Sequence, residues 1–222
     1  MKILLTTKLN NPNQYVDNVF EAVSSEAEVV VGVDNFWYST TRFDIVHFQW
    51  PEELFYWNQP NEGDIVKLTS RLDDLKSEGV KFIGTMHNEM PHKKWTLGET
   101  LYKKVYEYLD GLIHFGEYSI TLFEELYPNL DSIKHCIIEH PYYKDLDEKC
   151  TTKLAKKKLG FETQELLFVV PGKIRFKEEQ ALVVSAFKAY RKHNKKARLF
   201  ITRAYRESKQ SLLKSPMKRV MW

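Results

Sequence analysis

Polar and aromatic residues follow four of the short apolar runs in this sequence, where they could form a binding site. These segments are residues 7–13, 47–52, 85–92 and 116–119. Aromatic side chains stack on sugar rings, and Asn, Gln, Glu and His side chains hydrogen-bond to hydroxyl groups. The segments therefore predict a sugar-like ligand, unless their Asn, Pro and His residues only form ordinary turns at strand ends. The side chains expected to hold this ligand are Asn10, Gln49, Trp50, Asn88, Glu89 and Glu117.

A second group of residues lies in the stretch VVPGKIRFKEEQALVVSAF. A strand is predicted to end there at Gly172, and Lys173, Arg175 and Lys177 follow at the start of a helix. Glycine lets backbone amides face a ligand, while cations and the positive end of a helix dipole favour phosphate groups. These four residues predict a diphosphate-binding site. A solvated basic turn is the alternative.

One loop has a composition that also occurs in metal sites, because His87 and His92 flank Glu89. Pro91 prevents a helix that would place both imidazoles on one face. No cysteine or further histidine stands at a usual ligand spacing. We therefore expect no metal ion and no cofactor.

The elements that must position these residues follow from hydrophobic periodicity. Short β-branched runs alternate with longer amphipathic stretches, which is typical of βαβ units and a parallel sheet covered on both faces. Strands are predicted near 2–6, 28–33, 44–49, 80–86, 111–115 and 135–139, and helices near 13–24, 63–78, 98–109 and 117–127. The predicted fold is α/β, with a Rossmann-like doubly wound parallel sheet that binds ligands beyond the carboxyl ends of its strands.

Individual residues support this reading of the elements. Leu68, Leu72 and Leu75 recur at helical spacing, and Gly79 follows them as a helix stop. His47 and His114 lie inside apolar strands, so we expect them to be hydrogen-bonded core residues.

A lysine-rich polar stretch interrupts the alternation and predicts a domain boundary. We expect a first domain at 1–148, a basic linker at 149–164 and a second domain at 165–222. The last part predicts a strand at 166–171, a helix with one apolar face, a strand at 197–202 and another helix start. The residues of that apolar face are Val183, Ala186, Phe187 and Tyr190. No closing strand is expected, so the second domain is predicted to be incomplete and the chain truncated.

Composition and charge limit the class of protein. The chain is 43% hydrophobic and 14% aromatic, which is enough for a core, and no apolar run reaches the roughly 18 residues of a membrane span. Residues 1–10 lack the features of a secretory signal, so we expect a cytoplasmic protein. Residues 1–148 hold 13 Lys/Arg against 25 Asp/Glu, whereas 149–222 hold 20 against 5. Nucleic acid is not expected as the partner of this basic half, because no stacking aromatics are interleaved with the cations.

The basic turn and four further segments together carry a resemblance to a known family. The segments are FDIVHFQWP, GTMHNEMPH, GLIHFGEYS and IIEHPYY, in that order along the chain. The chain resembles group one, family four glycosyltransferases of the GT-B fold, from their N-terminal domain into the start of their donor-binding domain. The sequence departs from the family pattern at Glu178, where a glycine is usual, and in KLNNPNQ, which replaces a glycine-rich loop.

The resemblance implies a function and roles for domains and residues. Residues 1–148 would form the acceptor-side domain, and residues 165–222 would belong to the donor-binding domain. It implies a metal-independent, retaining transferase that moves a sugar from a nucleotide-diphosphate donor to a glycan or lipid-linked acceptor of surface polysaccharide synthesis. Gly172, Lys173 or Arg175, and Lys177 would contact the donor diphosphate, and His87 would lie near the reacting sugar. The basic stretch at 149–158 would suit peripheral contact with anionic lipid at the inner membrane face.

Three other functions are compatible with the sequence to different degrees. A truncated chain is expected to have little activity alone, so a non-catalytic sugar- or partner-binding module is the main alternative. An epimerase of the same fold would share the donor site. A nucleic-acid-binding protein is the least favoured, and it would show steeply salt-dependent binding.

Overall fold

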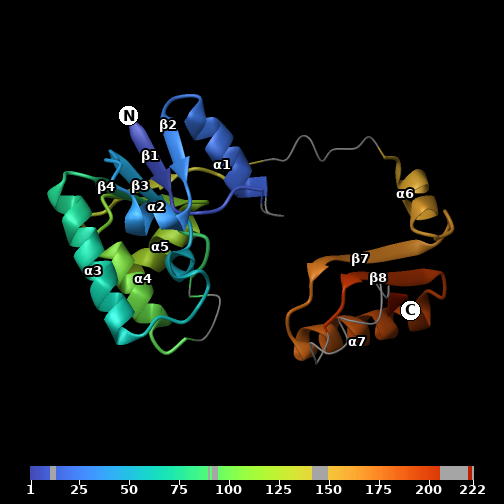
Figure 1. Ribbon diagram of the computed structural model, residues 1–222. Helices are drawn as coiled ribbons and strands as arrows, with labels where there is room; N and C mark the ends of the chain where they lie inside the picture. Colours follow the sequence, from blue (N-terminus) through green and yellow to red (C-terminus); the bar gives the residue numbers. More distant parts are fainter. Residues whose placement is uncertain (11–13, 90, 92–94, 142–149, 206–219, 222) are drawn as a thin grey trace. The chain divides into compact units, whose positions relative to one another are not determined.

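The computed structural model describes residues 1–10, 14–89, 91, 95–141, 150–205 and 220–221. The chain divides into two compact units, Met1–Tyr142 and Tyr143–Trp222 (Figure 1). Each unit has its own sheet and its own hydrophobic cluster. No helix among the described residues is both long and apolar enough to cross a membrane.

The first unit contains a six-stranded sheet in the order β2-β1-β3-β4-β5-β6. All five strand pairs are parallel. The strands are β1 (Lys2–Leu5), β2 (Glu28–Val31), β3 (Ile45–Phe48), β4 (Lys81–Thr85), β5 (Gly111–His114) and β6 (Lys134–Ile137). Because β2 lies on one side of β1 and β3 on the other, the sheet is doubly wound, which confirms the predicted fold class.

The helices of this unit alternate with its strands along the chain, which Figure 1 colours from blue to green in this unit. The helices are α1 (Gln14–Ser24), α2 (Val33–Tyr38), η1 (Pro51–Phe55), α3 (Glu62–Ser77), α4 (Gly98–Tyr106) and α5 (Glu117–Leu126). Helices α1, α3, α4 and α5 correspond to the four predicted helices. Helix α2 and the 3-10 turn η1 were not predicted from the sequence.

Local signals explain why α3 begins and ends where it does. Its N-cap residue Asn61 accepts from the backbone N–H of Asp64, and the Asp64 carboxylate accepts from the backbone N–H of Asn61. At the other end the N–H groups of Gly79 and Val80 donate to the carbonyls of Lys76 and Leu75. Gly79 has φ of +84°, the left-handed conformation that this helix ending requires.

The core of the first unit lies between the sheet and its helices. Leu68 and Leu72 are fully buried and Leu75 is 2% exposed, which confirms the predicted apolar face of α3. They belong to the same cluster as Phe48 and Phe82 of the sheet. Burial of side chains of this size contributes about 1.5–3 kcal/mol each.

Gly79 provides a test of this helix ending. We expect Gly79→Ala to lower the free energy of unfolding of the first unit by about 1 kcal/mol, since alanine is strained at positive φ. The matched control is Gly116→Ala, because Gly116 has φ of −179° and open space where a Cβ would lie. Chemical denaturation of both variants measures the difference. Equal losses of unfolding free energy in the two variants would contradict the requirement for glycine at position 79.

The second unit has a three-stranded sheet in the order β7-β8-β9. Its elements are α6 (Thr152–Lys158), β7 (Leu166–Lys173), α7 (Lys177–His193), β8 (Ala197–Arg203) and β9 (Val220–Met221). Strands β7 and β8 are parallel, and β9 pairs antiparallel with β8. The prediction that no strand follows the one at 197–202 is therefore wrong. The predicted further helix start lies outside the described residues.

The apolar face of α7 differs in part from the prediction. Phe187 is buried and Val183 is partly buried against the sheet, as expected. Tyr190 is 42% exposed, although its ring contacts that of Phe168, and Ala186 is exposed. The sheet covers only a narrow strip of α7, because β7 and β8 are the only long strands of this unit among the described residues.

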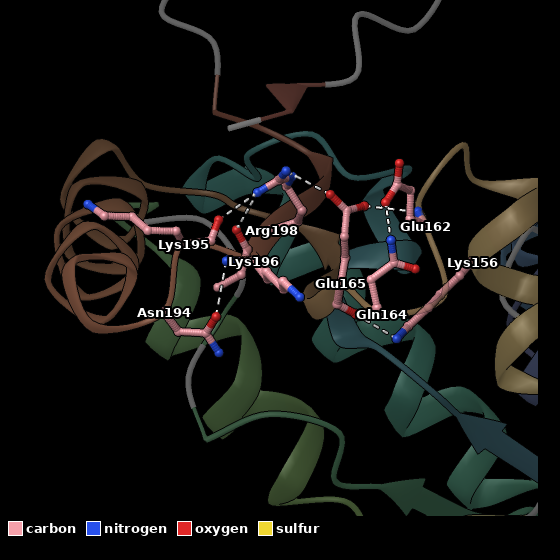
Figure 2. A network of polar contacts seen from close by, with 9 residues as sticks. Lys156, Glu162, Gln164, Glu165, Asn194, Lys195, Lys196 and Arg198 are labelled. Carbon is pink, nitrogen blue, oxygen red and sulfur yellow. Dashed lines mark hydrogen bonds and ion pairs between the residues drawn. The ribbon is translucent and has the colours of Figure 1, made fainter.

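A polar network joins α6 to the sheet of the second unit (Figure 2). Lys156 donates to the carbonyls of Thr163 and Glu165 at 3.0 and 2.6 Å. The Glu165 carboxylate forms an ion pair with Arg198 at 2.7 Å, and Arg198 also donates to the Lys195 carbonyl. The structure thus places a helix in the stretch for which the sequence predicted a linker, and Lys156 joins this helix to the segment that leads into β7.

Candidate functional site

The first candidate site lies at the carboxyl ends of the parallel strands in the first unit. The chain order reverses between β1 and β3, and ligands of doubly wound sheets bind beyond the strands at this point. Segments that follow β1, β3, β4 and β5 all meet at this edge. They include most of the residues that the sequence analysis selected.

An aromatic cluster occupies this edge of the sheet. The ring of His87 stacks on that of Trp50, with ring centroids 4.1 Å apart and planes 20° apart. The ring of Tyr15 of α1 is perpendicular to that of His87, with centroids 5.0 Å apart, and the centroid of the Phe115 ring lies 5.3 Å from that of His87. His140, which follows β6, contacts both Tyr15 and Phe115. Contacts of this kind fix the plane of the His87 ring.

A chain of four polar side chains runs from β4 to His87. Thr85 Oγ1 lies 2.8 Å from His47 Nε2, and Gln49 Nε2 lies 3.2 Å from the same nitrogen. Gln49 Oε1 lies 2.8 Å from His87 Nε2. Burial lowers the pKa of His47 to about 4, so this imidazole is neutral at physiological pH. His47 is thus a hydrogen-bonded residue of the core, as the sequence predicted.

Two adjacent glutamates of η1 are buried beside this cluster. Glu52 Oε2 accepts a hydrogen bond from the Tyr102 hydroxyl at 2.7 Å, and Glu53 Oε1 accepts one from Thr7 at 3.1 Å. Burial raises the pKa of Glu53 to about 7, and the neighbouring Glu52 charge adds to this rise. Within the described part of the chain, Glu53 Oε2 and Trp50 Nε1 are buried polar atoms with no hydrogen-bond partner. Glu53 was not among the site residues predicted from the sequence.

The other strand histidine, His114, belongs to the core. It is fully buried, contacts Ser119 Oγ through Nδ1 and lies 2.8 Å from His135 Nδ1 through Nε2. Burial lowers the pKa of His114 to about 4, and the nearby His135 adds to this effect. His114 is therefore the neutral, hydrogen-bonded core residue that the sequence predicted.

The structure brings together only some of the predicted ligand-binding residues. Gln49, Trp50 and His87 are in direct contact, and Gln49 is 1% exposed, with its amide oxygen 2.8 Å from His87 Nε2. Asn88 is half-buried and lies beside Tyr102. The remaining three predicted residues, Asn10, Glu89 and Glu117, are exposed on segments at the same edge of the sheet.

The second candidate site is the turn between β7 and α7. Strand β7 continues through Gly172 to Lys173, so the predicted strand end at Gly172 is wrong by one residue. Gly172 has φ of +79° and lies in an irregularity of the β7–β8 register. Its carbonyl accepts a hydrogen bond from Thr202 Oγ1 at 2.7 Å. This bond fixes the backbone at the bend.

The three predicted cations of this turn are all exposed. Lys173 ends the strand, Arg175 lies in the turn and Lys177 is the first residue of α7. The first turn of the helix also contains Glu179, whose carboxylate accepts from the Arg175 backbone N–H at 3.2 Å. The turn therefore presents cationic side chains beside a helix N-terminus that has no side-chain cap.

The structure groups no metal ligands among the residues that it describes. No cluster there contains three or more His, Cys, Asp or Glu side chains that could hold an ion. His92 lies outside the described residues. His87 uses its Nε2 atom for the contact with Gln49.

Several aromatic residues of the first site were not predicted, because they are far apart in the sequence and come into contact only in the folded chain. Tyr15 was assigned only to a helix, while Phe115 directly follows β5 and His140 lies three residues beyond the end of β6. The position after a strand is the signal that could have identified the last two. Nothing in the sequence indicates that Glu53 becomes buried.

Comparison with known proteins supports the fold. The sequence matches no family model, and no curated protein matches it. The crystal structure of HepE (Alr3699) from Anabaena in complex with UDP-glucose is similar to this chain, with a TM-score of 0.55 and 10% sequence identity. The match covers 95% of this chain and 63% of the HepE chain. The likeness supports the α/β fold that the sequence predicted for both units.

Proposed function

We propose that this chain takes part in the transfer of a sugar from a nucleoside-diphosphate donor to a glycan or lipid-linked acceptor. The observation that carries the proposal is the cluster of Trp50, His87 and Tyr15 at the switch point of the sheet. Aromatic faces and edges beside hydrogen-bonding groups are suited to a sugar. The similarity to a chain solved with UDP-glucose adds support, since that chain has a related fold.

The two units would have different roles in this reaction. The first would hold the acceptor sugar, with Asn88, Glu89 and Glu117 on the segments around His87. The second would hold the donor diphosphate on Lys173, Arg175 and Lys177, near the bend at Gly172. Fixed cations beside a helix N-terminus stabilise the negative charge of a diphosphate leaving group, so this chemistry does not require a metal ion. Retention of the donor configuration is part of the proposal by family resemblance.

Helix α6 supports the proposal of a lipid-linked acceptor. Lys153 and Lys157 are exposed on this helix, and Leu154 is 45% exposed between them. Basic side chains next to an apolar one suit contact with anionic lipid headgroups. Transfer to a surface polysaccharide precursor at a membrane face is consistent with this composition.

Amide hydrogen exchange with and without UDP-glucose tests the donor assignment. We expect slower exchange for the backbone amides of 172–180, because a bound diphosphate orders the turn and the first turn of α7. Peptides from α4 are the internal control, and their exchange should not change. If only amides outside residues 172–180 exchange more slowly with UDP-glucose, or if no amide does, the proposed donor site is contradicted.

A non-catalytic sugar-binding module is the second candidate function. It is favoured by the burial of Gln49, whose amide oxygen and nitrogen both contact histidine side chains, so that a structural group lies next to His87. Binding of a simple sugar to the first unit without any nucleotide binding to the second would select this alternative.

A further inference from the structure

Two consecutive aromatic residues after η1 have an unusual backbone conformation. Tyr56 has φ of +52° and Trp57 has φ of +61°, both in the left-handed region. A bulky side chain is strained there, whereas glycine adopts positive φ without steric cost. Asn10 is the other non-glycine residue with positive φ in the described part of the chain, and asparagine tolerates this region. A turn that only had to reverse the chain would be expected to contain glycine or asparagine, so the two aromatic side chains need another explanation.

Hydrogen bonds hold this strained pair in place. The Tyr56 hydroxyl donates to Asp34 Oδ1 at 2.5 Å, and the Tyr56 backbone N–H donates to the Glu53 carbonyl at 2.8 Å. The backbone N–H of Trp57 donates to the Glu52 carbonyl at 3.0 Å. Tyr56 is nevertheless 45% exposed and Trp57 is partly exposed, so burial in the core does not account for the strain. Strain that the surrounding contacts maintain in this way is concentrated at ligand-binding sites.

Trp57 lies on the outer side of the aromatic cluster at the carboxyl edge of the sheet. Its ring centroid is 6.2 Å from that of Trp50, and the two planes are 46° apart. Trp50 is 9% exposed and stacks on His87, so little of its own ring is left for a ligand. Trp57 also lies beside the Glu53 carboxyl, and it stays partly exposed with these contacts in place. Trp57 is therefore better placed than Trp50 to contact a ligand.

We propose that Trp57 is the platform on which the acceptor sugar stacks, and that the left-handed pair of Tyr56 and Trp57 sets the angle of this platform. This step rests on the proposed function, and it assigns the sugar contact to a residue that the sequence did not single out. The face of an indole ring packs against the C–H groups of a sugar ring. The bond from Tyr56 to Asp34 and the contact with Trp50 hold the platform before a ligand arrives, so little conformational entropy is lost on binding.

The charges around Trp57 favour an uncharged sugar. Glu53 lies beside the Trp57 ring, Glu52 precedes it in η1, and Asp34 holds its neighbour in the chain. Lys8 offsets the charge of Glu53 only in part. A uronic acid or a sugar phosphate stacked on Trp57 would be repelled by these carboxylates, while a hydroxyl group can donate a hydrogen bond to one of them. The platform is thus expected to select neutral sugars.

Spectra of the indole groups test the platform in the unmodified chain. In ¹⁵N-tryptophan-labelled protein, the signal that is missing from Trp57→Phe identifies Trp57 among the five tryptophans. At pH 8, above the pKa of about 7 that burial gives Glu53, we expect millimolar methyl glucoside, methyl galactoside or N-acetylglucosamine to shift the Trp57 signal in a saturable way. Glucuronate should bind at least about tenfold more weakly, because its carboxylate is repelled.

Two results of these titrations would overturn the proposal. The absence of a saturable Trp57 shift with all three neutral sugars would overturn the platform. Equal affinity for glucuronate and the neutral sugars would overturn the selection against charge.

Variants at position 57 separate stacking from folding, with ligand-observed saturation-transfer spectra as the measure of affinity. Trp57→Ala should bind the neutral sugars at least about tenfold more weakly, whereas Trp57→Phe keeps a flat face and should stay within about threefold of the wild-type protein. Tyr190→Ala removes a 42% exposed ring from the second unit, and as the matched control it should bind as the wild-type protein does. Unchanged affinity in Trp57→Ala would overturn the platform.

A glycine at position 57 tests the role of the backbone. Trp57→Gly should unfold at a higher urea concentration than Trp57→Ala, since glycine is not strained at positive φ, and should bind sugar as weakly as Trp57→Ala does. Unfolding of Trp57→Gly at a lower urea concentration than Trp57→Ala would overturn the left-handed pair as the support of the platform.

A failure of the platform is distinguishable from a failure of the proposed function. Saturable Trp57 shifts with neutral sugars in a chain that binds no UDP-glucose would support the platform and contradict the donor assignment. Binding of UDP-glucose without any response of Trp57 to neutral sugars would overturn the platform and leave the donor site intact. Where Trp57→Ala does not fold, the Trp57 signal of the wild-type protein still decides.

Discussion

Glu53→Gln is expected to raise the free energy of unfolding of the first unit by about 2–3 kcal/mol at pH 8 and to change it little at pH 4. Burial raises the pKa of this carboxyl from 4.5 to about 7. The folded state therefore binds the proton more tightly than the unfolded state. Stability is lost as the pH rises from about 4.5 to about 7, where the folded carboxyl must ionise in a buried position.

The groups around Glu53 do not remove this penalty. Thr7 and Trp57 favour the charged form through hydrogen bonding, and Lys8 favours it by its charge. Desolvation and the nearby Glu52 outweigh them. Glutamine keeps an oxygen that can accept from Thr7 and carries no charge at any pH.

Urea unfolding at pH 4 and pH 8 measures the difference between the wild-type protein and Glu53→Gln. Glu89→Gln is the matched control, because Glu89 is exposed after β4. A change of under about 0.5 kcal/mol is expected for it at both pH values. Parallel losses of stability with pH in the wild-type protein and Glu53→Gln would show that Glu53 is not the group responsible.

Phe82→Ala is expected to lower the free energy of unfolding of the first unit by about 3–5 kcal/mol. Phe82 is fully buried in β4, with its ring 5.9 Å from that of Phe48 and 6.4 Å from that of Tyr108. Truncation would leave a cavity between the sheet and α3 that the packed neighbours cannot fill.

Thermal and chemical denaturation measure this loss. Tyr118→Ala is the control, since Tyr118 is an aromatic residue of α5 that is 71% exposed. Its removal should change the stability of the unit by less than about 0.5 kcal/mol. A similar loss in both variants would mean that β4 is not at the centre of the core.

Regular elements could be predicted from the sequence because their signals are periodic. Leu68, Leu72 and Leu75 define the buried face of α3 at helical spacing, and each β-branched run of the first unit became a strand. Helix α6 was missed because its many lysines were interpreted as a polar linker, although Lys156 bonds to the segment that leads into β7. The short strand β9 carries too few residues for any periodic pattern.

The candidate site could be predicted only in part, for a different physical reason. The rule that ligands lie beyond parallel strands identified Trp50 and His87, which are in contact. Gln49 was expected to face a ligand, but its two hydrogen bonds depend on the spacing between strands, which a single sequence does not give. From the sequence alone, Glu53 is expected to be a polar loop residue. Its carboxyl is buried only because η1 packs against the sheet.

The central claim is that the chain binds a nucleotide sugar through the turn after β7, and a calorimetric titration with UDP-glucose tests it most directly. We expect saturable binding by the wild-type protein and an affinity at least about tenfold lower in the double variant Lys173→Ala, Arg175→Ala, since each charge-assisted contact contributes about 1.5–3 kcal/mol. Lys192→Ala removes one exposed positive charge from the other end of α7 and should bind as the wild-type protein does. No binding by the wild-type protein, or equal affinity in the double variant, would contradict the claim.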